Sequence, residues 1–190
     1  MRSIPAPPEP LSNGQIALRL AAERDIPEIL IAYQDDPQLH IRLGEERPPS
    51  GAELGRRMEQ APANLVQGIG VTLTITEAGA DDCRGQVIVH GFDWDNHRAE
   101  IGVWIVPQLR NQGVARRALA LAAPWLFEAC ALKRIALLTE PGNEPMLRAA
   151  RAAGFVEEGV LRAYRRGPGK RLDMTVLSLV PRDLTGDLTK

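Results

Sequence analysis

The segment from Ile101 to Arg117 constrains the fold more than any other part of this sequence. Its first half, up to Val106, is short, apolar and rich in β-branched residues, and Pro107 then removes a backbone donor. Its second half is a basic turn around Gly113, followed by an Ala/Leu-rich run with helical spacing over 114–129. We therefore predict a buried strand that ends abruptly and leads through a turn into a long helix.

Such a junction is suited to bind an anion. The first amides of a helix have no partner within it, and together they carry about half a positive charge. Arg110, Arg116 and Arg117 add full charges, and Gly113 lets an anion approach the backbone closely. A pyrophosphate fits this description better than a carboxylate. The pattern alone leaves a second interpretation open, a solvated helix start with surface arginines.

The remaining elements predict an α/β fold, in which helices flank a mixed, mostly antiparallel sheet. Short loops join three successive strands, which favours an antiparallel meander. The long helix separates the central strand from the next one, so these two strands should be parallel. The expected strands are 15–20, 71–76, 85–92, 99–106, 133–139, 157–164 and 170–180, and the expected helices begin at Asp25, Ser50, Val114 and Asn143 and end near Tyr33, Glu59, Ala129 and Gly154.

Composition narrows the class of protein. The chain has 190 residues and a formal net charge of −1, so no global basic field exists to hold nucleic acid or an anionic membrane. No apolar run is long enough to span a bilayer, and the start of the chain lacks the apolar stretch of a signal peptide, so we expect a cytoplasmic protein. We expect a flexible proline-rich tail over 1–14, one domain over 15–181 and a C-terminal tail over 182–190.

Neither the cysteines nor the acidic loop predicts a metal site. Cys83 and Cys130 have no Cys or His at metal-ligand spacing, so both should be reduced and inert. The oxygen-rich loop from Asp93 to His97 lacks the Gly and the distant Glu of an EF-hand. We interpret it as a turn with solvated side chains.

Four features occur in the order that a GNAT N-acetyltransferase shows. They are Ala99-Glu100-Ile101-Gly102 at the start of the central strand, the loop Arg110-x-x-Gly113-x-Ala115, Asn143, and the closing segment Gly154 to Arg162. Together with Arg171-Leu172-Asp173-Met174 in the last strand, they resemble the ribosomal-protein alanine N-acetyltransferase branch. The resemblance implies the GNAT acyl-CoA N-acyltransferase fold, whose central sheet splays between the fourth and fifth strands after a bulge, here beside Val106.

The same resemblance implies acetyl-CoA as cosubstrate and no metal. The pantetheine arm would pair with the backbone of the central strand as a false strand, and the pyrophosphate would lie on the amides of the following loop. The cofactor-binding residues implied are Trp104, Ile105, Val106, Arg110, Asn111, Gln112, Gly113, Val114, Ala115, Arg116 and Asn143.

The acceptor amine must lose a proton, and Glu100 matches a Glu common in the family, so it is the first candidate for the base. The alternative is a surface carboxylate paired with Arg98 or Arg110. His90 and His97 are eligible by residue type, although a lone His beside a strand is more often structural.

Two departures from the branch leave the acid and the base uncertain. Met146 stands where relatives carry a Ser that protonates the thiolate, and Arg165 stands where some carry a Glu proposed as base. Tyr164 is an alternative acid, and a packed or hydrogen-bonded tyrosine is the other interpretation.

The function implied is transfer of acetyl from acetyl-CoA to a primary amine by direct attack. The acceptor is either a protein N-terminus or a small molecule. The competing hypothesis is a catalytically impaired acyl-CoA-binding regulatory module, favoured by Met146 and Arg165. The oligomeric state stays open, although members of this family are often homodimers.

Overall fold

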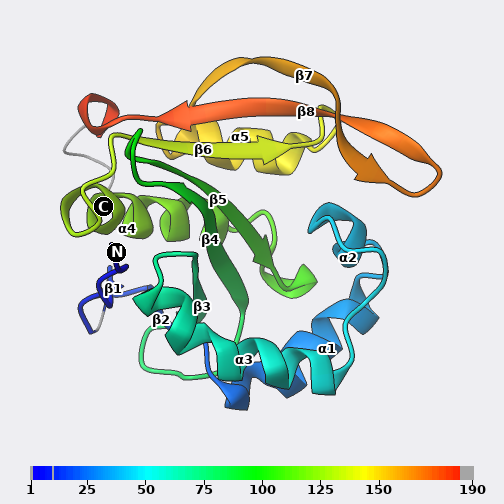
Figure 1. The fold of residues 1–190 in the computed structure, drawn as a ribbon. Helices are drawn as coiled ribbons and strands as arrows, with labels where there is room; N and C mark the ends of the chain where they lie inside the picture. Colours follow the sequence, from blue (N-terminus) through cyan, green and yellow to red (C-terminus); the bar gives the residue numbers. More distant parts are fainter. Residues whose placement is uncertain (1, 10, 185–190) are drawn as a thin grey trace.

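The computed structural model describes residues 2–9 and 11–184; the end of the expected C-terminal tail, 185–190, lies outside them. In this part of the chain, one sheet of eight strands has the order β1-β2-β3-β4-β5-β6-β8-β7 (Figure 1). The strands are β1 Leu11–Ser12, β2 Ile16–Leu20, β3 Val71–Glu77, β4 Gly85–Asp93, β5 Arg98–Ile105, β6 Arg134–Thr139, β7 Val156–Gly167 and β8 Lys170–Leu179. The helices are α1 Ile26–Asp35, α2 Leu39–Arg42, α3 Gly51–Val66, α4 Val114–Glu128 and α5 Glu144–Ala152, with short 3-10 turns at Glu23–Asp25, Pro107–Leu109 and Pro181–Asp183.

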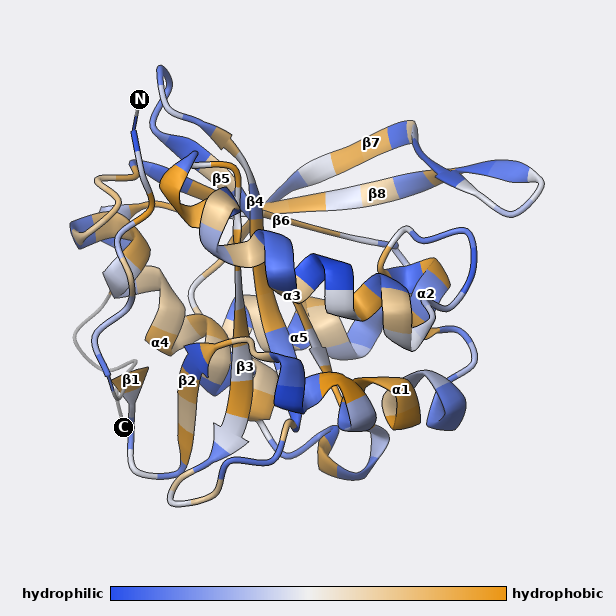
Figure 2. Ribbon diagram, turned by 60° about the horizontal axis from the view of Figure 1, so that its bottom comes forward, coloured by the Kyte–Doolittle hydropathy of each residue, from blue (hydrophilic) through white to orange (hydrophobic). Residues whose placement is uncertain are grey.

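Helices cover both faces of the sheet. On one face α4 and α5 pack into the larger core, where Leu119, Leu126 and Ala150 are each 0% exposed. On the other face α1, α2 and α3 cover a smaller cluster that includes Trp104. Figure 2 shows the apolar residues along α4 and the central strands, with hydrophilic residues on the outer turns of α3.

The predicted topology around the central strand is confirmed. Strands β3, β4 and β5 form an antiparallel meander, and β6 is parallel to β5. The β5–β6 pairing covers only Arg98 to Glu100 on β5, whereas β5 continues to Ile105 and β6 to Thr139. The sheet therefore splays between these strands as predicted, but it opens already after Glu100 rather than beside Val106. The nearest register shift lies on the β4 side, between His90 and Asp93.

Some elements were not anticipated from the sequence. Strand β1 pairs with β2, and Ile4, within the expected tail, is 4% exposed and donates its amide to the Leu65 carbonyl at 2.9 Å. Helix α2 was not predicted, since its four residues are too few for a periodic pattern. Helix α3 runs past Pro62 to Val66 instead of ending near Glu59, because Leu65 packs on the core.

The helix ends follow the capping chemistry expected from the sequence. Ser50 and Glu53 form a capping box at α3, in which the Ser50 hydroxyl accepts from the Glu53 amide at 3.3 Å. Asn143 caps α5, and Gly154 follows that helix with a φ of 90°, a left-handed conformation that glycine adopts without strain.

Asp25 anchors the start of α1, and its loss should destabilise the fold. This carboxylate is 1% exposed and accepts from Arg19 at 2.6 and 3.0 Å and from the Thr74 hydroxyl at 2.6 Å. We expect Asp25→Asn to lower the free energy of unfolding by about 1.5–3 kcal/mol, the usual worth of hydrogen bonds to a charged group. Urea unfolding followed by circular dichroism measures this.

The effect of Asp25 on stability should depend on pH. Burial would raise the pKa of its carboxyl, but hydrogen bonds from Arg19, Thr74 and Ala22 outweigh burial and hold the pKa below its ordinary value. The stabilisation is thus present above the unfolded-state pKa of about 3.9 and is lost as the pH falls through the lower, folded-state pKa. A wild type that keeps its full advantage over Asp25→Asn at pH 2 would contradict this account.

The two cysteines should not react while the protein is folded. Burial raises the pKa of Cys83 to about 12 and that of Cys130 to about 11, so both remain thiols at neutral pH. We expect iodoacetamide at pH 8 to alkylate both more than about 100-fold more slowly than in denaturant, because only the thiolate reacts. Mass spectrometry of intact protein measures the rates, and fast labelling of the native protein would contradict the burial of these thiols.

Candidate functional site

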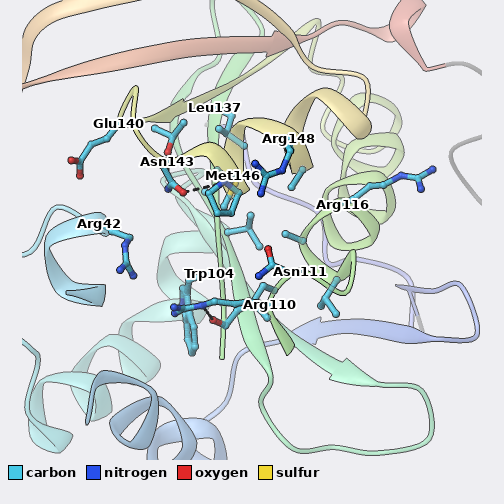
Figure 3. A pocket seen from close by; sticks show the side chains of 18 of the residues that line it. Arg42, Trp104, Arg110, Asn111, Arg116, Leu137, Glu140, Asn143, Met146 and Arg148 are labelled. Carbon is cyan, nitrogen blue, oxygen red and sulfur yellow. Dashed lines mark hydrogen bonds between the residues drawn. The ribbon is translucent and has the colours of Figure 1, made fainter. Parts of the chain in front are cut away.

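A large cavity lies where β5 and β6 separate. It has a volume of about 960 Å³ and is bounded by Trp104 and Ile105 on β5 and by Leu137 to Thr139 on β6. Residues of α2 line it on one face of the sheet, and residues of α4 and α5 line it on the other. The cavity therefore passes through the sheet from one layer of helices to the other (Figure 3).

The free edge of β5 faces this gap. The Val106 amide donates to the Arg84 carbonyl on the β4 side at 3.0 Å, and successive residues of a strand point their amides in opposite directions. The backbone groups of Val103 and Ile105 therefore face β6, where the ladder is missing. The Ile105 carbonyl accepts a hydrogen bond from Arg110 Nε at 3.0 Å. An extended ligand in the gap could therefore form backbone hydrogen bonds with the unpaired edge of β5.

The start of α4 holds a run of unpaired backbone donors. Asn111 and Gly113 have φ values of 60° and 74°, and the first helical bond runs from the Arg117 amide to the Gly113 carbonyl at 3.0 Å. Within the described residues, the amides of 111–116 donate to no acceptor. Six adjacent donors at a helix N-terminus fit a diphosphate.

Several arginine side chains line the cavity, and they differ in whether a carboxylate already binds them. Arg116 and Arg148 line it and form no hydrogen bond or ion pair with any described residue (Figure 3). Arg110 and Arg42 both bind Asp36 instead. Sequence reasoning missed Arg148; its only signal was a cation two residues after Met146 in a short amphipathic helix.

Asn143 lies at the rim of the same cavity. Its Oδ1 accepts from the Met146 amide at 3.4 Å, and its Nδ2 donates to the Thr139 hydroxyl at 3.0 Å. Asn143 thereby ties the end of β6 to the start of α5. Met146 also lines the cavity, and its thioether side chain has no proton to donate.

A second cavity of about 260 Å³ holds both candidate catalytic residues. Glu100 and Tyr164 line it, and neither lines the larger cavity. Leu138 lines both cavities, so the two are neighbours. Glu100 belongs to the last residue pair of β5 and β6 before they part, which places it at the apex of the gap.

The carboxylate of Glu100 is half-buried and has no hydrogen bond or ion pair among the residues that the structure describes. The two partners considered from sequence are engaged elsewhere. Arg98 binds Asp93 at 3.0 Å, and Arg110 binds Asp36 at 2.5 Å. Arg134, which also lines the second cavity, binds Glu158 at 2.5 Å.

A bulge in β7 sets the position of Tyr164. The register passes from Leu161 opposite Met174 to Arg165 opposite Leu172, so three residues of β7 face one residue of β8. Side chains of β8 hold the bulge: Asp173 accepts from the Ala163 amide at 2.7 Å, and Arg171 donates to the Ala163 and Tyr164 carbonyls at 2.8 and 2.7 Å. Tyr164 is 49% exposed.

The other candidates lie apart from both cavities or are engaged in structure. His90 and His97 line neither cavity, and His97 Nδ1 lies 3.1 Å from the Ala131 carbonyl oxygen. Asp93 accepts from the Asn96 amide at 3.1 Å and from its side chain at 2.8 Å, as in the turn expected. Arg165 donates to the Arg42 carbonyl at 3.0 Å and binds Glu140 at 3.4 Å.

The family described as "Acetyltransferase (GNAT) domain" matches residues 15–156 of the chain. The chain belongs to the GNAT acetyltransferase family. It is 31% identical to YdaF of Bacillus subtilis (strain 168), which carries the name of a ribosomal N-acetyltransferase, over 92% of this chain and 96% of YdaF.

Solved structures share the GNAT fold. RimJ of Mycobacterium smegmatis, solved in complex with CoA-disulfide, superposes with a TM-score of 0.83 at 22% identity, over 93% of this chain and 87% of RimJ. Spermidine N-acetyltransferase of Vibrio cholerae, solved with CoA and spermine, superposes with a TM-score of 0.76 at 21% identity, over 89% of this chain and 97% of that enzyme. In residues 2–9 and 11–184, no helix has the length and apolar character to cross a membrane.

Proposed function

We propose that this protein is an N-acetyltransferase that moves acetyl from acetyl-CoA to a primary amine. The observation that carries the proposal is the cavity between β5 and β6, where the unpaired amides at the start of α4 and the free edge of β5 meet. Glu100 lines the neighbouring cavity, which shares Leu138 with the first.

The binding groups suit the parts of acetyl-CoA. The amides of 111–116 and the side chain of Arg116 would hold the pyrophosphate, and the backbone groups of Val103 and Ile105 that face the gap would pair with the pantetheine amides. The amides of Trp104 and Val106, expected from the sequence to take part, point to β4 instead. Asn143, with Thr139, supplies polar groups at the β6 side of the cavity. Fixing the thioester beside the acceptor removes several kcal/mol of the entropic barrier.

Direct attack requires one proton acceptor and one proton donor. The amine nitrogen bonds to the thioester carbon, the carbon–sulfur bond breaks, and the amine proton passes to Glu100. The CoA thiolate leaves and takes a proton from the Tyr164 hydroxyl. The two residues line one cavity, so they are placed to serve a single acceptor.

A protein N-terminus is the acceptor that we propose. The resemblance to the ribosomal-protein alanine branch and the name of YdaF support it. Free amines form the second class to test, since a spermidine N-acetyltransferase shares the fold. Incubation with acetyl-CoA and a panel of N-terminal peptides, polyamines and amino acids, followed by mass spectrometry, decides between them; acetylation of polyamines alone would contradict the peptide proposal.

The second candidate function is an acyl-CoA-binding regulatory module without catalysis. Met146 and Arg165 favour it, since Met146 has no proton to give and Arg165 is held by Glu140 and the Arg42 carbonyl. Release of free CoA separates the two candidates. Tight acetyl-CoA binding with no CoA release for any amine in the panel would support the module and overturn the enzyme.

A further inference from the structure

The carboxylate of Asp36, at the end of α1, joins two parts of the larger cavity. Asp36 is 7% exposed and binds Arg110, in the loop before α4, at 2.5 Å. It also binds Arg42, the last residue of α2. Burial would raise the pKa of Asp36, but hydrogen bonds from Arg42 and Arg110 outweigh burial and hold the pKa below its ordinary value. Asp36 is therefore ionised at neutral pH, with an arginine of each wall as its partner.

Helix α2 depends on such contacts for its position. It has only four residues, far fewer than an isolated helix needs to be stable in water. Its attachments among the described residues include the buried side chain of Leu39, the bond from the Leu39 amide to the Asp36 carbonyl at 2.9 Å, the Asp36–Arg42 pair and the bond from Arg165 to the Arg42 carbonyl. In Figure 1, α2 lies below the projecting end of the β7–β8 hairpin. Loss of the ion pair between Asp36 and Arg42 would therefore remove one of the contacts that hold α2 in place.

Arg110 is the partner through which a bound anion can act on α2. Its Nε donates to the Ile105 carbonyl at the gap, and its Nη2 donates to the Asp36 carboxylate. A phosphate on the amides of 111–116 is a second anion beside this guanidinium and competes with Asp36 for it. Arg42 and Arg110 both donate to Asp36 Oδ2, so their guanidiniums repel each other; as Arg110 turns toward the phosphate, this repulsion is relieved and Arg42 is held more firmly on Asp36.

We propose that Asp36 is a positioning residue that couples binding of the acyl-CoA phosphates at the start of α4 to the ordering of α2, the wall of the cavity on the other face of the sheet. The inference rests on the proposed function only in requiring that CoA binds at this cavity. Binding of the cosubstrate thereby orders the part of the larger cavity that α2 lines.

Hydrogen exchange tests the coupling with CoA itself as the probe. The amides of Arg42, Leu43, Gly44 and Glu45 donate to carbonyls at 2.8 to 3.2 Å and report on α2. At saturating CoA we expect exchange over 39–45 to slow by about fivefold or more in wild type, a common strength of coupling between sites. In Asp36→Asn, also saturated with CoA, we expect no slowing over 39–45.

Asp25→Asn is the matched control, because Asp25 is also buried and arginine-paired but lines neither cavity. It should keep the CoA-dependent slowing, so general destabilisation is separated from lost coupling. If Asp36→Asn does not fold, Arg110→Gln breaks the same link at its half-exposed end and should also abolish the slowing. Slowing retained in either folded variant, or no slowing in a wild type that binds CoA, would overturn the inference. A wild type that binds no CoA would instead overturn the proposed function.

Discussion

Replacing Gly113 by Glu should lower the affinity for acetyl-CoA by more than about 100-fold. The new carboxylate would stand beside the amides of 111–116, where the pyrophosphate is expected. Two like charges at 4 Å repel by about 4 kcal/mol at a protein surface, and each 1.4 kcal/mol changes affinity tenfold. Isothermal titration with acetyl-CoA measures the loss.

Steric and backbone effects of this substitution need their own control. A Cβ at Gly113 would lie 3.2 Å from Arg117 Nη1, the mobile end of a long side chain, so space is not the obstacle. The φ of 74° does add strain. Gly79→Glu introduces the same side chain at a φ of 81° with nothing within 4 Å and outside both cavities. Gly79→Glu should bind acetyl-CoA as wild type does. Equal affinity in Gly113→Glu and Gly79→Glu would show that the phosphates do not bind at the start of α4.

Glu100→Gln should reduce kcat by about 10² to 10⁴-fold, the usual contribution of a general base. The amide keeps the size and shape of the carboxylate but cannot take the amine proton. Since Glu100 does not line the larger cavity, the affinity for acetyl-CoA should change little. Steady-state CoA release with the best acceptor, together with titration of acetyl-CoA, separates the two effects.

The control is Glu77→Gln, the same substitution at the end of β3, outside both cavities. It should keep the wild-type kcat. A Glu100→Gln variant with kcat within threefold of wild type would show that another group, or a chain of waters, accepts the proton. If the affinity for acetyl-CoA fell by the same factor as kcat, the substitution would have distorted the cavity between β5 and β6, and the loss of kcat would not identify a base.

Short-range sequence patterns, namely hydrophobic periodicity and helix-capping residues, predicted most of the fold. Alternation found β2 and β3, and the capping residues Ser50 and Asn143 marked two helix starts. Helix α2 and strand β1 were not found, because four and two residues are too short to show a period. Both are held by tertiary contacts instead: α2 by Asp36 and by Arg165, 123 residues away from Arg42, and β1 by pairing with β2.

The candidate site divides in the same way. The turn around Gly113 could be predicted because an anion site at a helix start needs only a local strand, a glycine and the first free amides. Asp36 could not, since its importance comes from Arg110, 74 residues away in sequence. Arg148 and the β7 bulge that places Tyr164 were likewise invisible, because partners on other elements define them.

The sequence by itself determined a strand, a basic glycine turn and a helix around which a GNAT acetyltransferase is built, because hydrophobic periodicity and capping act over a few residues. Only the tertiary structure decided where the sheet opens, that Glu100 stands at the apex of the gap, and that Arg98 and Arg110 bind other carboxylates. Ion pairs and strand partings depend on which distant segments meet, and short-range patterns carry no information about that.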